Sequence, residues 1–356
     1  MSSFELRTTL PCNQATWEAR SAEDWWKYAK KEPQIPFLSV LKSYMNPDTG
    51  ASIPELNALS RLLVLHGLMS IQWDMRRRDQ TSLDGLTNIK GFESTNGAVQ
   101  AKWQDRLAHS YDAWKADFDT YCMNMSFSLD TPSRKAEFLR FSTATTAIYH
   151  AAHITLNVEI LDLQIYAGAR HIIGRPVARA DYDRSRRIVK DWAKPGGSTA
   201  ATKAAWHAAH LLRDGILNLD NWDVNNAFHY PWCLYIATLT CWAFHFATSS
   251  TGMQENTNSS SCAGHRAGAN SRSDNEADDQ IVWHAKSEMN ALVSSMTSGT
   301  PENLWRVIGK YTTSGLTAVM AKHLSNVRWA VVHEGMKVLR GLVPERSINE
   351  YEAFLR

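Results

Sequence analysis

Histidine, tyrosine and cysteine side chains at helical spacing are the groups of this sequence that could do chemistry. His150 and His153 lie three residues apart, so one helix face can carry both. The pair His207 and His210 and the pair Cys241 and His245 also lie about one helical turn apart. A metal site needs such a pair and further ligands from elsewhere. Neither His-Glu-x-x-His nor Glu-x-x-His occurs, so we expect no bound metal and no cofactor.

A second set of residues could serve as acids and bases. His66 falls on an apolar helical stripe with Trp73 and Asp74, and a buried histidine near a carboxylate can be poised for proton transfer. The neighbours Tyr149 and His150, and the neighbours His229 and Tyr230, could add proton donors to a pocket. The candidate catalytic residues are thus His66, Asp74, Tyr149, His150, His153, His229 and Tyr230. The competing and favoured interpretation is that these side chains form hydrogen bonds within a helical core.

Composition and charge narrow the class of protein. Of the 356 residues, 44% are hydrophobic and 21% charged, which is typical of a globular chain. The formal net charge of +2 is too small to indicate nucleic-acid binding. The runs 76–78 and 184–190 are basic but have acidic neighbours, which indicates an ordinary charged surface. The five cysteines are odd in number and widely spaced, which favours a reducing compartment, and no secretory signal opens the sequence.

The apolar periodicity predicts helices almost everywhere and no strand. Ser52 to Glu55 resembles a capping box that opens a long helix, and Leu56, Leu59, Leu63, His66, Ser70 and Trp73 mark one stripe on it. Further helices are expected from Asn96 to beyond Cys122 and from Thr131 to about Tyr166. Later ones are expected over residues 182–192, 199–217, 231–247, 280–297, 301–311, 314–324 and 328–341.

Two segments stand out in this pattern. Residues 231–247 are apolar on nearly every side but are interrupted by Thr238, Thr240 and His245, which favours a central core helix over a membrane span. Residues 249–279 are rich in Ser, Asn, Gly and acidic residues and predict a flexible polar insertion. We therefore expect an all-α fold, an irregular bundle of about ten helices, in a single domain over residues 1–356 with this one disordered insertion.

Four sequence elements in order resemble a known family. The first is Leu-Pro-Cys at 10–12 with Ala-Thr-Trp-Glu-Ala at 15–19 and Ala-Glu-Asp-Trp at 22–25, and the second runs from Leu65 to Arg77. The third runs from His229 to Phe244, and the fourth from Trp329 to Arg340. Together they resemble the C-terminal part of the fungal-specific transcription factor domain, in the branch attached to two-cysteine two-histidine zinc fingers. The resemblance covers residues 8 to 342 outside the polar insertion.

The resemblance implies an all-helical regulatory region that binds a partner regulator or a second copy, inside the cell and in the nucleus, with the cytoplasm as alternative. Zinc-finger spacing is absent from this sequence, so we expect no direct nucleic-acid binding by this chain alone. We also expect no membrane association. The alternative is a stand-alone, cofactor-free cyclase or isomerase of fungal secondary metabolism, with a small-molecule ligand in a helical cavity. A scaffold that pairs with full-length regulators is a third interpretation.

Overall fold

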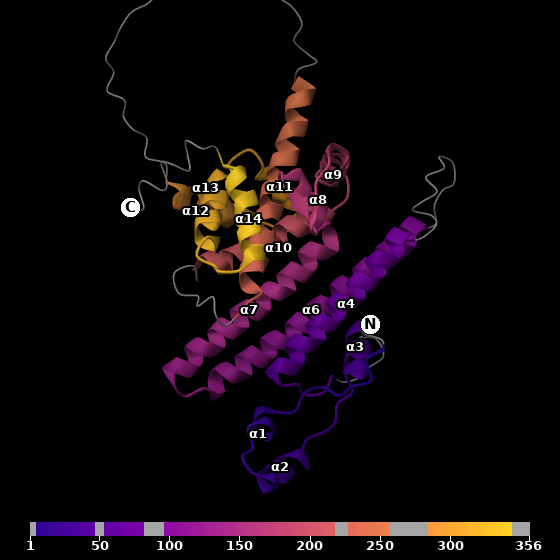
Figure 1. Cartoon of the computed structure of the whole chain (residues 1–356), viewed down its shortest axis with the longest axis vertical. Coiled ribbons are helices and arrows are strands. Elements are labelled where there is room, and N and C mark those ends of the chain that lie inside the picture. Colours follow the sequence, from indigo (N-terminus) through magenta and orange to yellow (C-terminus); the bar gives the residue numbers. More distant parts are fainter. Residues whose placement is uncertain (1–4, 47–52, 82–95, 218–226, 257–283, 344–356) are drawn as a thin grey trace, which may run out of the picture. The chain divides into compact units, whose positions relative to one another are not determined.

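The computed structural model describes residues 5–46, 53–81, 96–217, 227–256 and 284–343. Over these ranges nearly all regular structure is helical, and the predicted all-α fold is confirmed (Figure 1). The chain divides into two compact units, residues 1–156 and 157–356. The expectation of a single domain stays a prediction. The polar insertion expected over residues 249–279 also stays a prediction: its first residues, 249–256, are helical, and residues 257–279 lie outside the described residues.

The first unit is built on long helices. It contains α1 (Gln14–Trp17), α2 (Ala22–Ala29), α3 (Phe37–Met45), α4 (Ala58–Thr81), α6 (Asn96–Ser128) and α7 (Pro132–Asn157), whose last residue begins the second unit. Helix α4 runs beside α6, and α3 packs against both (Figure 1). Their core consists of large side chains that water does not reach, among them Leu41, Val64, Leu68, Tyr111, Trp114 and Phe118. Burying such side chains is the main favourable term for these helices.

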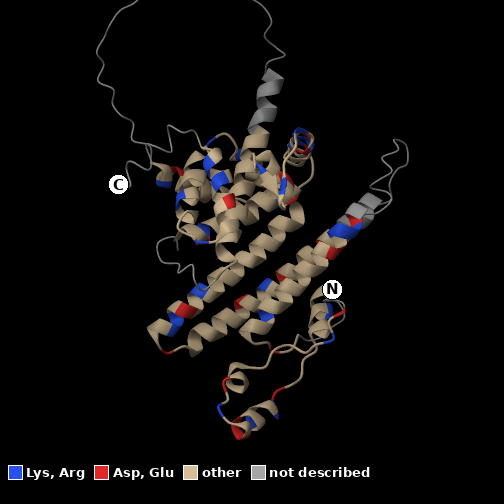
Figure 2. Cartoon of the chain, in the orientation of Figure 1, with Lys and Arg blue, Asp and Glu red and all other residues tan. Residues whose placement is uncertain are grey.

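The second unit surrounds one apolar helix. Helix α11 (Tyr230–Asn256) contacts α8 (Ile160–Tyr166), α9 (Arg179–Trp192), α10 (Ala200–Leu217), α13 (Ser314–Leu324) and α14 (Ala330–Gly341). No acidic or basic residue other than histidine lies between Tyr230 and Thr248, as Figure 2 shows along this helix. The predicted central core helix is therefore present. Helix α12 (Ala285–Thr297) and the 3-10 helix η4 (Pro301–Arg306) pack against α10.

Several predicted boundaries were wrong. The capping box at residues 52–55 does not start α4; Asn57 does, because its side-chain oxygen accepts the Ser60 N–H at 2.8 Å. The single helix expected from Thr131 to Tyr166 breaks after Asn157, and α8 begins at Ile160. The described residues also contain one short hairpin, β1 (His171–Ile172) with β2 (Arg175–Pro176). Its two turn residues, Ile173 and Gly174, both have positive φ, at 50° and 76°, as a tight hairpin turn requires.

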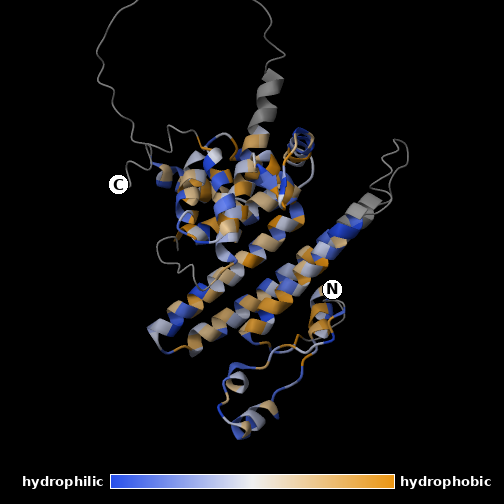
Figure 3. Ribbon diagram, viewed as in Figure 1, coloured by the Kyte–Doolittle hydropathy of each residue, from blue (hydrophilic) through white to orange (hydrophobic). Residues whose placement is uncertain are grey.

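The buried face of α4 also differs from the prediction. The stripe expected to face inward is exposed at Leu59, His66 and Trp73, whereas Val64 and Leu68 on the opposite side are buried. Polar and apolar residues alternate along this helix (Figure 3). The sequence puts leucines on both of its faces, so periodicity alone cannot select the inner one. By contrast, apolar residues recur at three-to-four spacing along one face of α6 and of α7, which predicts the inner face of each helix, and that face is buried at Leu107, Trp114, Phe118, Ile148 and Ala152.

Within the described part of the chain, we find no helix that is both long and apolar enough to cross a lipid bilayer.

Candidate functional site

Two of the candidate side chains meet a carboxylate between α6 and α7, and a third packs beside them. The Tyr149 hydroxyl donates to Asp112 Oδ1 over 2.8 Å, and His153 Nε2 lies 3.1 Å from the same oxygen. The rings of Tyr149 and His153 pack edge to face with centroids 4.8 Å apart. His150, one turn before His153, packs its ring against Tyr149 at 5.0 Å. The spacing of these histidines therefore places both beside one tyrosine.

Burial and neighbouring charges shift the pKa values of Asp112 and Tyr149 in opposite directions. Burial alone would raise the pKa of Asp112, but the hydrogen bonds and charge of His153 and the bond from Tyr149 outweigh it and lower that pKa. Burial and the Asp112 charge both raise the pKa of Tyr149. The carboxylate thus stays ionised and the phenol stays protonated near neutral pH. An arrangement of this kind joins two helices.

The cluster continues to α4 through polar contacts. The Tyr111 hydroxyl donates to Gln72 Oε1 at 2.7 Å, and Gln72 Nε2 donates to Thr155 Oγ1 at 3.2 Å. The Arg76 guanidinium donates to the carbonyls of Thr155 and Leu156 at the C-terminal end of α7. A cation there donates hydrogen bonds to carbonyls that the helix leaves without partners, and the negative end of the helix dipole stabilises its charge.

The remaining candidates in this unit stand apart from the cluster. His66 is exposed on α4, and desolvation by neighbouring residues lowers its pKa. Asp74 follows it by eight residues on the same helix, roughly 12 Å along the axis. The expected proximity of His66 to a carboxylate in the core was wrong, because that face of α4 is exposed.

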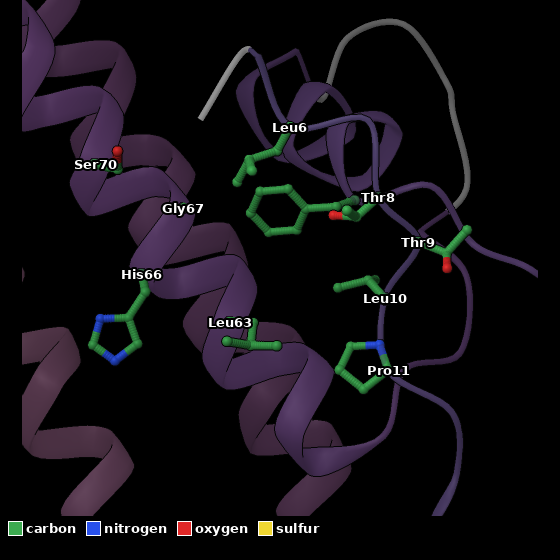
Figure 4. Close-up of a pocket in the computed structure, with 10 residues that line it drawn as sticks. Leu6, Thr8, Thr9, Leu10, Pro11, Leu63, His66, Gly67 and Ser70 are labelled. Carbon is green, nitrogen blue, oxygen red and sulfur yellow. The ribbon is translucent and has the colours of Figure 1, made fainter. Parts of the chain in front are cut away.

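A pocket of about 440 Å³ lies beside α4. Its lining comes from the N-terminal segment, α3 and α4: Leu6, Thr8, Thr9, Leu10, Pro11, Phe37, Leu63, His66, Gly67 and Ser70. In Figure 4 the His66 ring points away from Leu10 and Pro11, on the other side of the helix. The side chains that face the hollow are mainly apolar, and they suit an apolar group better than an acid–base reaction.

The last two candidates lie at the start of α11 in the second unit, where His229 directly precedes the helix and Tyr230 is its first residue. Tyr230 is 3% exposed, and burial together with the Asp214 charge raises its pKa. His229 is partly buried and packs edge to face against Phe228, with ring centroids 5.6 Å apart. Neither residue lines the pocket beside α4.

The predicted one-turn pairs do not gather further ligands. Among the described residues, no three histidine, cysteine or carboxylate side chains lie close enough to hold a metal ion. His210 packs against Trp206, with ring centroids 3.9 Å apart. Burial raises the pKa of Cys241 and lowers that of His245 to about 4. These thiol and imidazole groups are therefore neutral at physiological pH.

One polar cluster was not predicted from the sequence. Arg61, buried on α4, forms two bonds to Asp117 of α6, from Nε to Oδ2 at 2.9 Å and from Nη2 to Oδ1 at 3.3 Å. Tyr44 of α3 donates to the same Oδ2 at 2.9 Å, and the guanidinium lies 4.4 Å from the Tyr121 ring centroid. A lone arginine within the apolar run of α4 was the available signal, because a buried charge needs a partner. The cluster joins three helices.

Known proteins that are similar to this chain include a fungal transcription factor and two fungal zinc finger proteins. It is 42% identical over 347 residues to the nicotinate catabolism cluster-specific transcription factor of Emericella nidulans, a match that covers 96% of the chain. It is 26% identical over 338 residues to zinc finger protein klf1, and 24% identical over 240 residues to zinc finger protein zas1, both of Schizosaccharomyces pombe. These matches cover 94% and 65% of the chain.

The chain spans only part of each relative: 35%, 37% and 24% of their lengths in the same order. No protein family profile matches the sequence. No solved structure matches it either. The similarity to fungal regulators expected from the four sequence elements is thus confirmed at the level of individual proteins.

Proposed function

We propose that this chain is a transcription-regulating helical segment of the fungal type, which works in the nucleus through contacts with other proteins. The observation that carries the proposal is the similarity to a fungal transcription factor along 96% of the chain at 42% identity. Two further fungal zinc finger proteins match it over 94% and 65% of its length. The finer assignment, to the C-terminal part of the fungal-specific transcription factor domain, rests on the four sequence elements.

The contacts within the first unit support a structural role for the candidate residues. Asp112, Tyr149 and His153 join α6 to α7, and Arg76 binds the end of α7.

Exposed aromatic side chains support contact with other proteins: Trp17, Trp26 and Trp73 are 81%, 65% and 66% exposed. Large aromatic residues are enriched where proteins bind one another.

A tethering experiment tests this function. The chain is fused to an unrelated DNA-binding module in fungal cells, and transcription of a reporter carrying that module's site is measured. We expect reporter transcripts to change several-fold relative to the module alone. The matched control is the same fusion with Leu68→Asp, which places a charge in the core of the first unit and abolishes the effect. An unchanged reporter, with the intact fusion present in the nucleus, would contradict the proposal.

A further inference from the structure

Helix α9 carries a basic face. Five residues at helical spacing make up this face: Arg179, Asp183, Arg186, Arg187 and Lys190. The three arginines are exposed, and Asp183 and Lys190 are partly buried. The opposite side of the helix is buried at Ser185 and Val189. We call these five residues the α9 basic face, and it extends roughly 17 Å along the helix axis.

Two of the three acidic residues of α9 are already paired. Asp183 accepts from Arg179 Nε at 3.2 Å, one turn earlier on the same face. Asp181 lies on another side of the helix, where Arg175 of β2 binds it at 2.7 Å. The third, Asp191, is exposed at the edge of the basic face. Each pair cancels one positive charge with one negative charge, so the charge of the face comes from its other members.

Three cations of the α9 basic face remain available to a partner. Among the described residues, none of Arg186, Arg187 and Lys190 forms an ion pair. The Arg187 Nε donates to the Asp183 carbonyl over 3.4 Å, and the guanidinium stays exposed. Lys194, exposed in the turn after α9, continues the row one turn beyond Lys190. The net charge of +2 averages over all faces of the chain and does not reveal this row.

A face of this composition suits a polyanion better than another protein. The centre of a protein interface is apolar, and charged residues, lysine in particular, are depleted there. None of the five residues of the α9 basic face is apolar, and Ile188, which is 42% exposed, lies one turn from the buried Ser185. Arginine and lysine without apolar neighbours are the groups that neutralise phosphates of nucleic acids. Duplex DNA has one negative charge per about 1.7 Å of its axis, so about ten charges pass beside a helix of this length.

We propose that the α9 basic face binds the phosphates of duplex DNA without reading the base sequence. Arg186, Arg187 and Lys190 each neutralise a phosphate and release its counterions. The contact is weak by itself and strengthens the hold of a regulator whose bases are read by another module. It modifies the expectation of no direct nucleic-acid binding, which rested on net charge and zinc-finger spacing. The proposal rests on the proposed function in choosing DNA among polymers of phosphate.

Fluorescence anisotropy of a labelled duplex, titrated with the whole chain, tests the contact. At about 50 mM salt we expect a dissociation constant in the micromolar range, equal for two unrelated base sequences. The logarithm of the binding constant should fall with the logarithm of the salt concentration with a slope of about −2 to −3, since each phosphate contact contributes about 0.9.

Charge-removing variants locate the contact. Arg186→Gln combined with Arg187→Gln should weaken binding at least about tenfold and reduce the salt slope by about 2. The matched control is Arg134→Gln combined with Lys135→Gln, which removes two exposed charges from the first turn of α7 and should change neither quantity. Unchanged helical content in both double variants shows that they fold.

A variant that should bind more tightly complements these losses. Asp183→Asn removes the acid from the α9 basic face and releases Arg179 from its ion pair, so the dissociation constant should fall several-fold. A misfolded protein would not gain affinity in this way.

Four results would overturn the proposal. The chain could fail to bind the duplex at low salt, or could prefer one base sequence. The Arg186 and Arg187 double variant could bind as tightly as the wild-type chain. Polyglutamate or vesicles containing phosphatidylserine could bind the chain more tightly than the duplex does, which would assign the face to an acidic protein or a membrane. The tethering experiment holds the chain at DNA through another module, so it can succeed or fail independently of these results.

Discussion

At the scale of single residues, removing the hydrogen bond between Tyr149 and Asp112 tests the structural role of the candidate site most directly. Tyr149→Phe should lower the free energy of unfolding by about 1 kcal/mol, because the lost bond joins a hydroxyl to an ionised carboxylate that is itself 59% exposed. Urea unfolding measures the change. Tyr28→Phe, on an exposed part of α2, is the control and should change stability by less than about 0.5 kcal/mol. An equal effect of both substitutions would refute the structural role.

His245 should make the second unit sensitive to acid. Burial lowers its pKa to about 4 from the ordinary 6.5, so between these values the unfolded chain binds a proton that the folded chain does not. Stability should therefore fall as the pH drops from about 6.5 to about 4, by about 3 kcal/mol at most. His245→Leu should remove this slope from urea midpoints measured across that range. Phe246→Leu, which changes no titratable group, should keep it.

At the scale of elements, the close packing of α12 against α13 requires a glycine at one position. A Cβ on Gly315 of α13 would lie 2.5 Å from the Ala285 carbonyl oxygen of α12, a backbone atom that cannot move aside. Gly315→Ala should therefore destabilise the protein by about 1–3 kcal/mol, although alanine is the better helix former. At Gly341 of α14 a Cβ would meet nothing within 4 Å, so Gly341→Ala should be neutral or stabilising. Thermal unfolding of the pair gives the comparison, and equal melting temperatures would contradict it.

The helices could be predicted from sequence where only one face is apolar. Residues 314–324 were expected as a helix with the bounds that α13 has, and the buried side of α6 was predicted from Leu107, Trp114 and Phe118. On α4, leucines occur on both faces, and tertiary packing against α3 and α6 selects the inner one. For the same reason the placement of His66 was wrong.

The candidate site, too, could be predicted from the sequence only where its residues lie on one helix. The shared face of His150 and His153 follows from their spacing, and both pack against Tyr149. The carboxylate that His153 and Tyr149 share, Asp112, comes from another helix, and no local pattern in the sequence connects the two helices. The break between α7 and α8 was missed because apolar residues continue at helical spacing through Val158.

The whole molecule should not recognise DNA sequences by itself. Its formal net charge is +2 and its sequence lacks zinc-finger spacing, so any DNA binding should be weak and should vanish as salt is raised. A gel-shift titration of the purified chain with specific and scrambled duplexes measures this. A sequence-specific shift that resists salt would mean that the chain reads bases directly, contrary to this expectation.

Regulatory activity of a fungal transcription factor is the central property that we propose for this chain. The most direct measurement replaces the matching third of the nicotinate catabolism cluster-specific transcription factor of Emericella nidulans with this chain and quantifies transcripts of the nicotinate catabolism cluster. We predict that the chimaera restores transcripts well above those of a factor lacking that third. A chimaera that accumulates in the nucleus yet leaves transcription at the level of the deletion would contradict this assignment.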